Sequence, residues 1–304
     1  MGAELALMLE QDLILSIVTV VFALLIGSFL NVVIVRLPRQ VQWQWEKDEQ
    51  GTTPPPGIAW PPSHCPTCEH TLSWWENLPL LSYLLLRGRC RTCGTGISLR
   101  YPLVEALTAL LSLVVVLKLG LQWPTVAALA LTWALIALAF IDLEHFLLPD
   151  QITLPLLAAG LLVNAIGGFT DPLSALIGAV SGYGILWAVY HAYRVVRPGR
   201  EGFGYGDFKL LGALGAWLGW QLLDLVILLS AGVGAVVGIT LILLRRHQRS
   251  EPLPFGPYLA GAGWLVLLWE KELRLLLDTL FNPLVTLLSR VLAPLLNPLF
   301  TLFT

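Results

Sequence analysis

The stretch from residue 123 to residue 143 reads WPTVAALALTWALIALAFIDL, an apolar run that ends at a single carboxylate, Asp142. An apolar run of about 20 residues is long enough to cross a bilayer as a helix. A second apolar run opens with the sequence GYGD at 204–207 and places another carboxylate, Asp207, at the same kind of boundary. Because an ionisable residue where a span meets water is costly, both aspartates are candidates for function.

The composition of the whole chain agrees with a membrane protein. Hydrophobic residues make up 56% of the 304 residues and charged residues 12%, whereas soluble domains carry about 25% charged residues. The apolar segments are continuous rather than alternating, which favours helices over a transmembrane barrel. The sequence therefore predicts an all-α polytopic membrane protein with about eight transmembrane helices. The expected spans are 13–35, 103–121, 123–141, 151–168, 173–193, 208–222, 224–244 and 256–269.

The positions of the basic residues predict the orientation of these spans. Cytoplasmic segments carry an excess of Lys and Arg, so the N-terminus is expected outside the cytoplasm. The same topology brings Asp142 and Asp207 to one face, the cytoplasmic one. Of the 18 Lys and Arg residues, all fall on the cytoplasmic side in this arrangement except Lys118, Lys271, Arg274 and Arg290.

One long polar segment, 36–100, interrupts the spans. Its first part, 42–62, is rich in Trp, Pro, Gly and charge and is expected to form an irregular loop. Its second part holds all four cysteines, as two Cys-x-x-Cys pairs. Disulfides are rare in the cytosol, and four thiolates match a closed tetrahedral zinc site of structural type. We therefore expect a zinc-ribbon-like cytoplasmic domain with ligands Cys65, Cys68, Cys90 and Cys93.

Two alternatives to this zinc site stay open at the sequence level. The cysteines could be unligated thiols or a redox pair. His64 and His70 flank the first pair and could replace a ligand, although with four cysteines present they are read as polar loop residues.

The chain divides into four expected parts. These are a first transmembrane helix at 1–35, the loop domain at 36–100, a transmembrane core at 101–269 and a leucine-rich tail at 270–304. Prolines interrupt the tail, which is expected to form an amphipathic helix at the membrane interface. No nucleotide-binding fingerprint and no basic patch of the nucleic-acid-binding type is present, so nucleic acid is not an expected partner.

Two carboxylates that can meet suggest one chemistry above others. One acts as base on a water and the other as acid on a carbonyl, as in an aspartyl protease. Each aspartate also has a plain structural interpretation. Asp207 could be a helix N-cap, which Asp favours, and Asp142 could be the polar end of a span.

The motifs around both aspartates resemble the signatures of the type IV prepilin peptidases. The sequence DLEHFLLPD at 142–150 is similar to one signature and GYGDFK at 204–209 to the other. The resemblance covers about residues 20–265. Further matching segments are GSFLNVVI at 27–34, ENLPLLSY at 76–83, RGRC at 87–90, RYPLVE at 100–105 and PFGPY at 254–258.

The resemblance implies an intramembrane aspartyl protease of the GxGD type, with Asp142 and Asp207 as its catalytic pair. The family removes a short charged leader from prepilins and pseudopilins at the cytoplasmic edge of the bacterial inner membrane. Many members then methylate the new N-terminal amine with S-adenosylmethionine, and the cysteine-bearing loop is linked to that step.

Gly88 is the candidate for the methyl-donor site that follows from this resemblance. Its alternative role is that of a turn glycine entering the second cysteine pair. Two other functions compete with the enzyme. One is a non-enzymatic zinc-ribbon scaffold of a pilus or secretion assembly, and the other is a transporter that uses the carboxylates as a relay.

Overall fold

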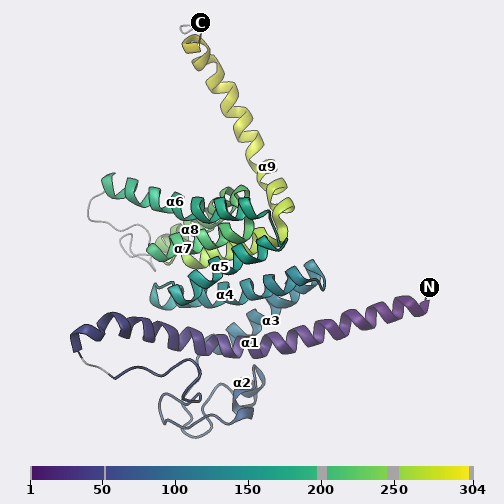
Figure 1. Cartoon of the computed structure of the whole chain (residues 1–304), viewed down its shortest axis with the longest axis vertical. Coiled ribbons are helices and arrows are strands. Elements are labelled where there is room, and N and C mark those ends of the chain that lie inside the picture. Colours follow the sequence, from purple (N-terminus) through teal and green to yellow (C-terminus); the bar gives the residue numbers. More distant parts are fainter. Residues whose placement is uncertain (1, 51–52, 197–203, 245–252, 301–304) are drawn as a thin grey trace.

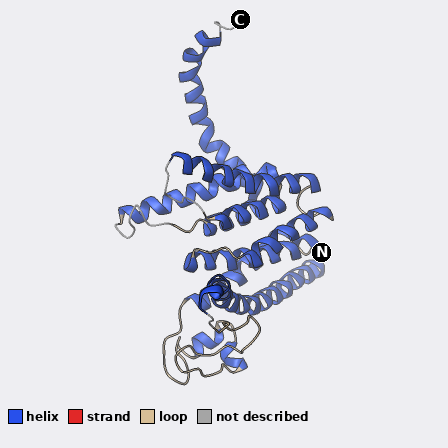
Figure 2. Ribbon diagram, turned by 60° about the vertical axis from the view of Figure 1, so that its left-hand side comes forward, coloured by secondary structure: helices blue, strands red, loops and turns tan. Residues whose placement is uncertain are grey.

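The computed structural model describes residues 2–50, 53–196, 204–244 and 253–300, and within this part the chain is helical with no β-strand (Figure 2). The only other regular elements there are isolated bridges in the loop domain. The predicted all-α fold is confirmed. The helices are α1 (Gly2–Gln50), α2 (Leu81–Leu85), α3 (Arg100–Leu119), α4 (Trp123–His145), α5 (Asp150–Ala165), α6 (Pro172–Val196), α7 (Tyr205–Leu218), α8 (Leu223–Leu243) and α9 (Gly256–Phe300), with 3-10 turns at Trp74–Asn77 and Trp220–Leu222.

The helices form two packed groups that share α4 (Figure 1). On one side α1 packs against α3 and α4, and on the other α7 packs against α5, α6 and α9. Residues 210–218 of α7 are all buried. Glycines permit this close packing, because a Cβ at Gly178 of α6 or at Gly215 of α7 would collide with the backbone of the other helix. The buried Trp217 donates to the backbone oxygen of Leu156 in α5, at 2.8 Å.

The predicted count of eight spans is not confirmed. Two of the expected spans are short helices. At 1.5 Å per residue, α5 is about 24 Å long and α7 about 21 Å, less than the hydrocarbon thickness of about 30 Å. The surrounding helices cover α7, so it does not have to meet lipid along its length. Among the described residues, five helices are long and apolar enough to cross: Leu13–Glu46, Arg100–Leu119, Trp123–His145, Pro172–Val196 and Trp220–Leu243.

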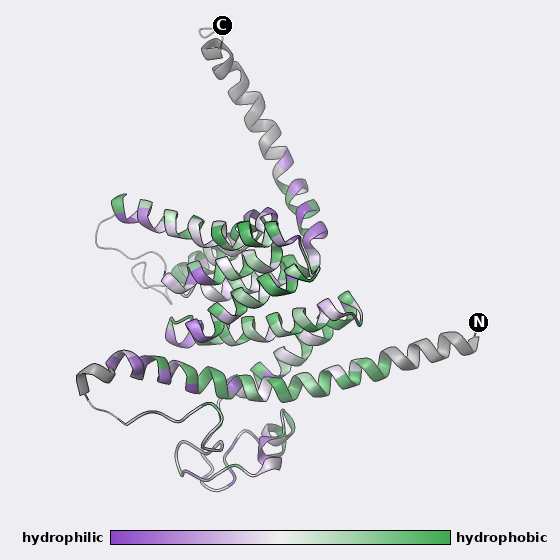
Figure 3. Cartoon of the chain, in the orientation of Figure 1, coloured by the Kyte–Doolittle hydropathy of each residue, from purple (hydrophilic) through white to green (hydrophobic). Residues whose placement is uncertain are grey.

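The first helix is much longer than expected, so the prediction of an irregular loop is wrong for residues 42–50. Residues 53–62 form no helix or strand, as predicted. Helix α1 continues through Pro38 to Gln50. The segment after it folds back along its surface: the Arg36 side chain donates to the backbone oxygens of Gly57, at 2.8 Å, and Pro61, at 2.7 Å. Hydrophilic residues predominate toward the C-terminal end of α1 (Figure 3). The contact with the returning segment gives this polar end of the helix a protein partner.

The tail is helical, as expected, but it is continuous with the last predicted span. Helix α9 bends at Trp269, where φ is −132° and ψ is 33°, and then runs through three prolines to Phe300. Near the bend Lys118 of α3 pairs with Glu272, at 2.8 Å. The placement of the tail at the membrane interface stays a prediction.

Candidate active site

The two candidate aspartates lie at helix ends. Asp142 is in the last turn of α4, which ends where Phe146 takes a left-handed conformation with φ of 53°. Asp207 is the third residue of α7, so it is not the N-cap of that helix. Both side chains are buried. Asp207 nevertheless accepts the N–H of the N-cap residue, Gly204, and Asp142 lies near the end of its span, so the structure is compatible with both plain structural interpretations.

A glycine amide holds each carboxylate. The N–H of Gly256, at the start of α9, donates to Oδ2 of Asp142 at 2.9 Å. The N–H of Gly204 donates to Oδ2 of Asp207 at 3.0 Å. Each aspartate is therefore oriented through one oxygen, Oδ2.

Leu148 brings the two aspartate motifs together. A Cβ at Gly206, next to Asp207, would lie 2.7 Å from Cβ of Leu148, and a Cβ at Gly256 would lie 3.1 Å from its Cδ2. Both glycines thus pack on one leucine. The segments that carry Asp142 and Asp207 therefore meet at one side chain.

Two ion pairs flank the aspartates, each formed two residues after one of them. Glu144 accepts from Arg100 at 2.6 Å. Lys209 donates to Asp150 at 2.6 Å and joins the first turn of α7 to the first residue of α5. Sequence reasoning missed these partners because opposite charges far apart in the chain carry no pairing signal.

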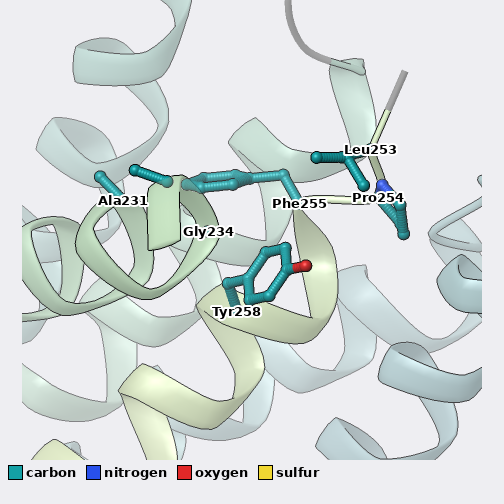
Figure 4. Close-up of a pocket in the computed structure, with 7 residues that line it drawn as sticks. Ala231, Gly234, Leu253, Pro254, Phe255 and Tyr258 are labelled. Carbon is teal, nitrogen blue, oxygen red and sulfur yellow. The ribbon is translucent and has the colours of Figure 1, made fainter. Parts of the chain in front are cut away.

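An apolar pocket of about 240 Å³ lies between α8 and the start of α9 (Figure 4). Ala231, Gly234 and Ala235 of α8 form one wall. Phe255 and Tyr258, from the segment that holds Asp142 through Gly256, form another, and Leu253 and Pro254 complete the lining. Its lining suits an apolar side chain. The PFGPY motif was the sequence signal for this segment, but not for its bond to Asp142.

The four cysteines form one cluster. Their sulfur atoms all lie within 4.8 Å of one another. The Sγ atoms of Cys65 and Cys93 are 3.8 Å apart, and those of Cys68 and Cys90 are 3.9 Å apart. A tetrahedron with metal–sulfur bonds of about 2.3 Å has edges of about 3.8 Å. All four are free thiols, so the donor set fits one metal ion.

The two histidines near the cysteines have other partners, in agreement with their interpretation as loop residues. His70 lies 3.1 Å from Oε2 of Glu76. His64 contacts the backbone oxygen of Pro62 at 3.3 Å. Glu76 also accepts the Ser73 N–H, and this bond, followed by the contact with His70, holds the pKa of its carboxyl below the usual range.

Gly88 lies where the chain enters the second cysteine pair. Its φ is +66°, and an added Cβ would lie 2.8 Å from the hydroxyl oxygen of Tyr83. Its N–H donates to the backbone oxygen of Tyr83 at 2.8 Å, and its own backbone oxygen accepts from the N–H of Ile97 at 2.7 Å. These contacts agree with the turn role. The methyl-donor role of Gly88 stays a prediction.

Two family models match this chain. The Bacterial Peptidase A24 N-terminal domain matches residues 21–119, and the Type IV leader peptidase family matches residues 129–239. The chain belongs to the type IV leader peptidase family. The second match contains both Asp142 and Asp207, and the first contains the four cysteines.

Curated members of the type IV leader peptidase family are similar over most of their length. A protein of Aeromonas hydrophila is 57% identical over 261 residues, which covers 83% of this chain and 90% of the relative. A protein of Pseudomonas aeruginosa is 49% identical over 263 residues, with 84% and 90% covered. Both are named prepilin leader peptidase/N-methyltransferase. No solved structure matches the chain.

Proposed function

We propose that this chain is a membrane-embedded aspartyl endopeptidase that removes the leader from type IV prepilins and pseudopilins and then N-methylates the new terminus. The observation that carries this proposal is the pair of buried aspartates, each oriented by a glycine amide through one oxygen. The names of its relatives support both activities.

Asp142 and Asp207 are the catalytic pair in this proposal. Two carboxylates at close range resist double ionisation, so they share one proton. The ionised partner takes a proton from the attacking water, and the protonated partner donates to the scissile carbonyl oxygen. The apolar pocket beside Gly256 receives a side chain near the scissile bond and helps to hold the substrate in register.

The loop domain carries the methylation step. Zinc bound by Cys65, Cys68, Cys90 and Cys93 would be structural, because four protein ligands leave no open coordination position. S-adenosylmethionine supplies an electrophilic methyl group to the amine that cleavage releases. Gly88 remains our candidate for the donor site, and its place at the entry to the second cysteine pair supports a link between the donor and the metal.

The protein resides as a multi-pass protein in the bacterial inner membrane. We infer that its N-terminus lies outside and that the loop domain and the aspartates face the cytoplasm. The excess of Lys and Arg in the segments on that side supports this orientation. Substrate leaders, which remain cytoplasmic before cleavage, would then reach both sites from the same face.

The proposal is tested with purified protein in liposomes that also hold a prepilin. Asp207→Asn should leave the leader uncleaved, and wild type should remove it. Asp224→Asn is a matched control, because Asp224 is an exposed aspartate near the start of another helix, α8. A scaffold or a transporter predicts the opposite result, that no sample, wild type included, loses the leader.

A further inference from the structure

Helix α2 carries an exposed apolar face. Leu81, Leu84 and Leu85 are 58%, 71% and 73% exposed. Residues spaced by three and four lie on the same side of a helix, so these leucines form one face. An exposed apolar face of this kind is unfavourable in water, so we expect it to contact a partner.

The position of α2 relative to the first span identifies that partner. The N–H of Leu80 donates to Oε2 of Glu105 in α3, at 2.9 Å. Glu105 packs on the middle of α1, because a Cβ at Gly27 would lie 2.7 Å from its Cα. Along the helix axis, Gly27 lies about 13 Å before Arg36, the residue at which the apolar run ends. The start of α2 is therefore held at the depth of the bilayer.

The arrangement of the ribbons agrees with this depth. Figure 1 shows α2 beside α1, well short of the C-terminal end of that helix. The neighbouring surface is already a lipid-facing one, because Leu103 and Leu110 of α3 are 56% and 58% exposed within a candidate span. The leucine face of α2 continues this apolar surface toward the cytoplasm.

The backbone around α2 is also suited to lipid. Polar backbone groups in a bilayer require partners, and irregular segments are tolerated only where those partners exist. Leu81, Ser82 and Leu84 donate to the oxygens of Pro79, Leu78 and Leu80. The turn that follows is bonded in the same way: the N–H groups of residues 86–89 donate to the oxygens of Ser82, Leu84, Tyr83 and Leu86.

Two arginines follow the leucine face. Arg87 and Arg89 are exposed and lie just after α2. Arginine side chains near a membrane surface extend their apolar stems along the lipid and place the guanidinium among phosphate groups. A leucine face followed by arginines thus matches the polarity change from acyl chains to anionic headgroups.

We propose that residues 78–89 form a lipid anchor that dips into the cytoplasmic leaflet, with the leucines of α2 among acyl chains and Arg87 and Arg89 at the phosphates. Residues 78–89 then hold the loop domain against the membrane, in addition to the connections of the domain to α1 and α3. This anchoring does not depend on the catalytic assignment. It keeps the cysteine cluster close to the membrane surface where the aspartates lie.

Site-specific photo-crosslinking tests this anchor in the full-length protein. A photoreactive amino acid replaces Leu84, the protein is placed in vesicles of phosphatidylethanolamine and phosphatidylglycerol, and intact mass spectrometry follows irradiation. We expect lipid adducts in a yield similar to that from a probe at Leu110 in α3. A probe at Thr92, exposed between two cysteines, should give a lower yield.

Each other outcome overturns the anchor. Absence of lipid adducts at Leu84, when Leu110 gives them, would place α2 in water. An adduct with a second copy of the chain, or with a prepilin added to the vesicles, in place of lipid would assign the face to that partner. A probe at Leu81 repeats the test at a second exposed site, so failure of one variant to fold leaves the experiment decisive.

Discussion

At the scale of single residues, glycines rather than polar side chains set the positions of the two aspartates. Gly204 and Gly256 supply the N–H groups that orient the carboxylates, and Gly206 and Gly256 bring both motifs onto Leu148. The sequence marked these glycines as parts of motifs. It could not indicate that Gly256 contacts Asp142, because the two residues come from distant parts of the chain and meet only through packing.

Gly256→Ala tests this role directly. The added Cβ would lie 2.7 Å from Oδ2 of Asp142 and would force the carboxylate away. Since a displacement of about 1 Å can cost about 100-fold in rate, we expect a loss of that order in cleavage. Gly261→Ala on the same helix, where nothing lies within 4 Å of the added Cβ, is the matched control and should keep its activity. Equal rates for both variants would exclude positioning by Gly256.

Gly88→Trp should yield pilin that is cut but not methylated. The residue has a positive φ and faces Tyr83, so a large side chain disturbs the entry to the second cysteine pair and leaves α4 and α7 intact. Mass spectrometry of co-expressed pilin reports leader removal and the added methyl group separately. Gly96→Trp, at an exposed position with open space around an added Cβ, is the control. Normal methylation by the Gly88 variant would move the donor site elsewhere.

At the scale of elements, the Lys209–Asp150 pair joins the start of α7 to the start of α5. Exposed ion pairs contribute about 0.2–1 kcal/mol, so Lys209→Ala should lower the free energy of unfolding by about that amount, as measured by denaturant unfolding. Exchanging the two charges, Asp150→Lys with Lys209→Asp, should recover part of the loss. An exchanged pair that is no better than the single variant would show that Lys209 acts in some way other than through Asp150.

We expect the loop domain to depend on a metal bound by its four cysteines. Purified protein should carry about one zinc, since a tetrathiolate site takes one ion. Cys90→Ser should lower the zinc content and increase protease sensitivity of 53–100, because the metal supplies much of a small domain's folding free energy. Elemental analysis of protein prepared without chelators makes the check. A zinc-free wild type that resists proteolysis equally well would contradict it.

At the scale of the whole molecule, the sequence predicted the helical class and a cysteine cluster, and it marked the two aspartate motifs, which meet at Leu148. These features depend on local patterns such as apolar run length and Cys-x-x-Cys spacing. The length of α1 and the number of spans were not predictable in the same way. Contacts of Arg36 with a returning segment accompany the extension of α1, and the neighbours of α7 let a short helix remain in the core. Both effects depend on tertiary packing.

The most direct measurement is the initial rate of prepilin cleavage by wild type, Asp142→Asn, Asp207→Asn and the double variant in liposomes. Residues that act as one unit show grossly non-additive effects, so all three variants should fall to the same background rate. Asp224→Asn should cleave like wild type. Cleavage at the wild-type rate by either single variant, or a double variant slower than both singles by the product of their effects, would contradict a shared catalytic pair.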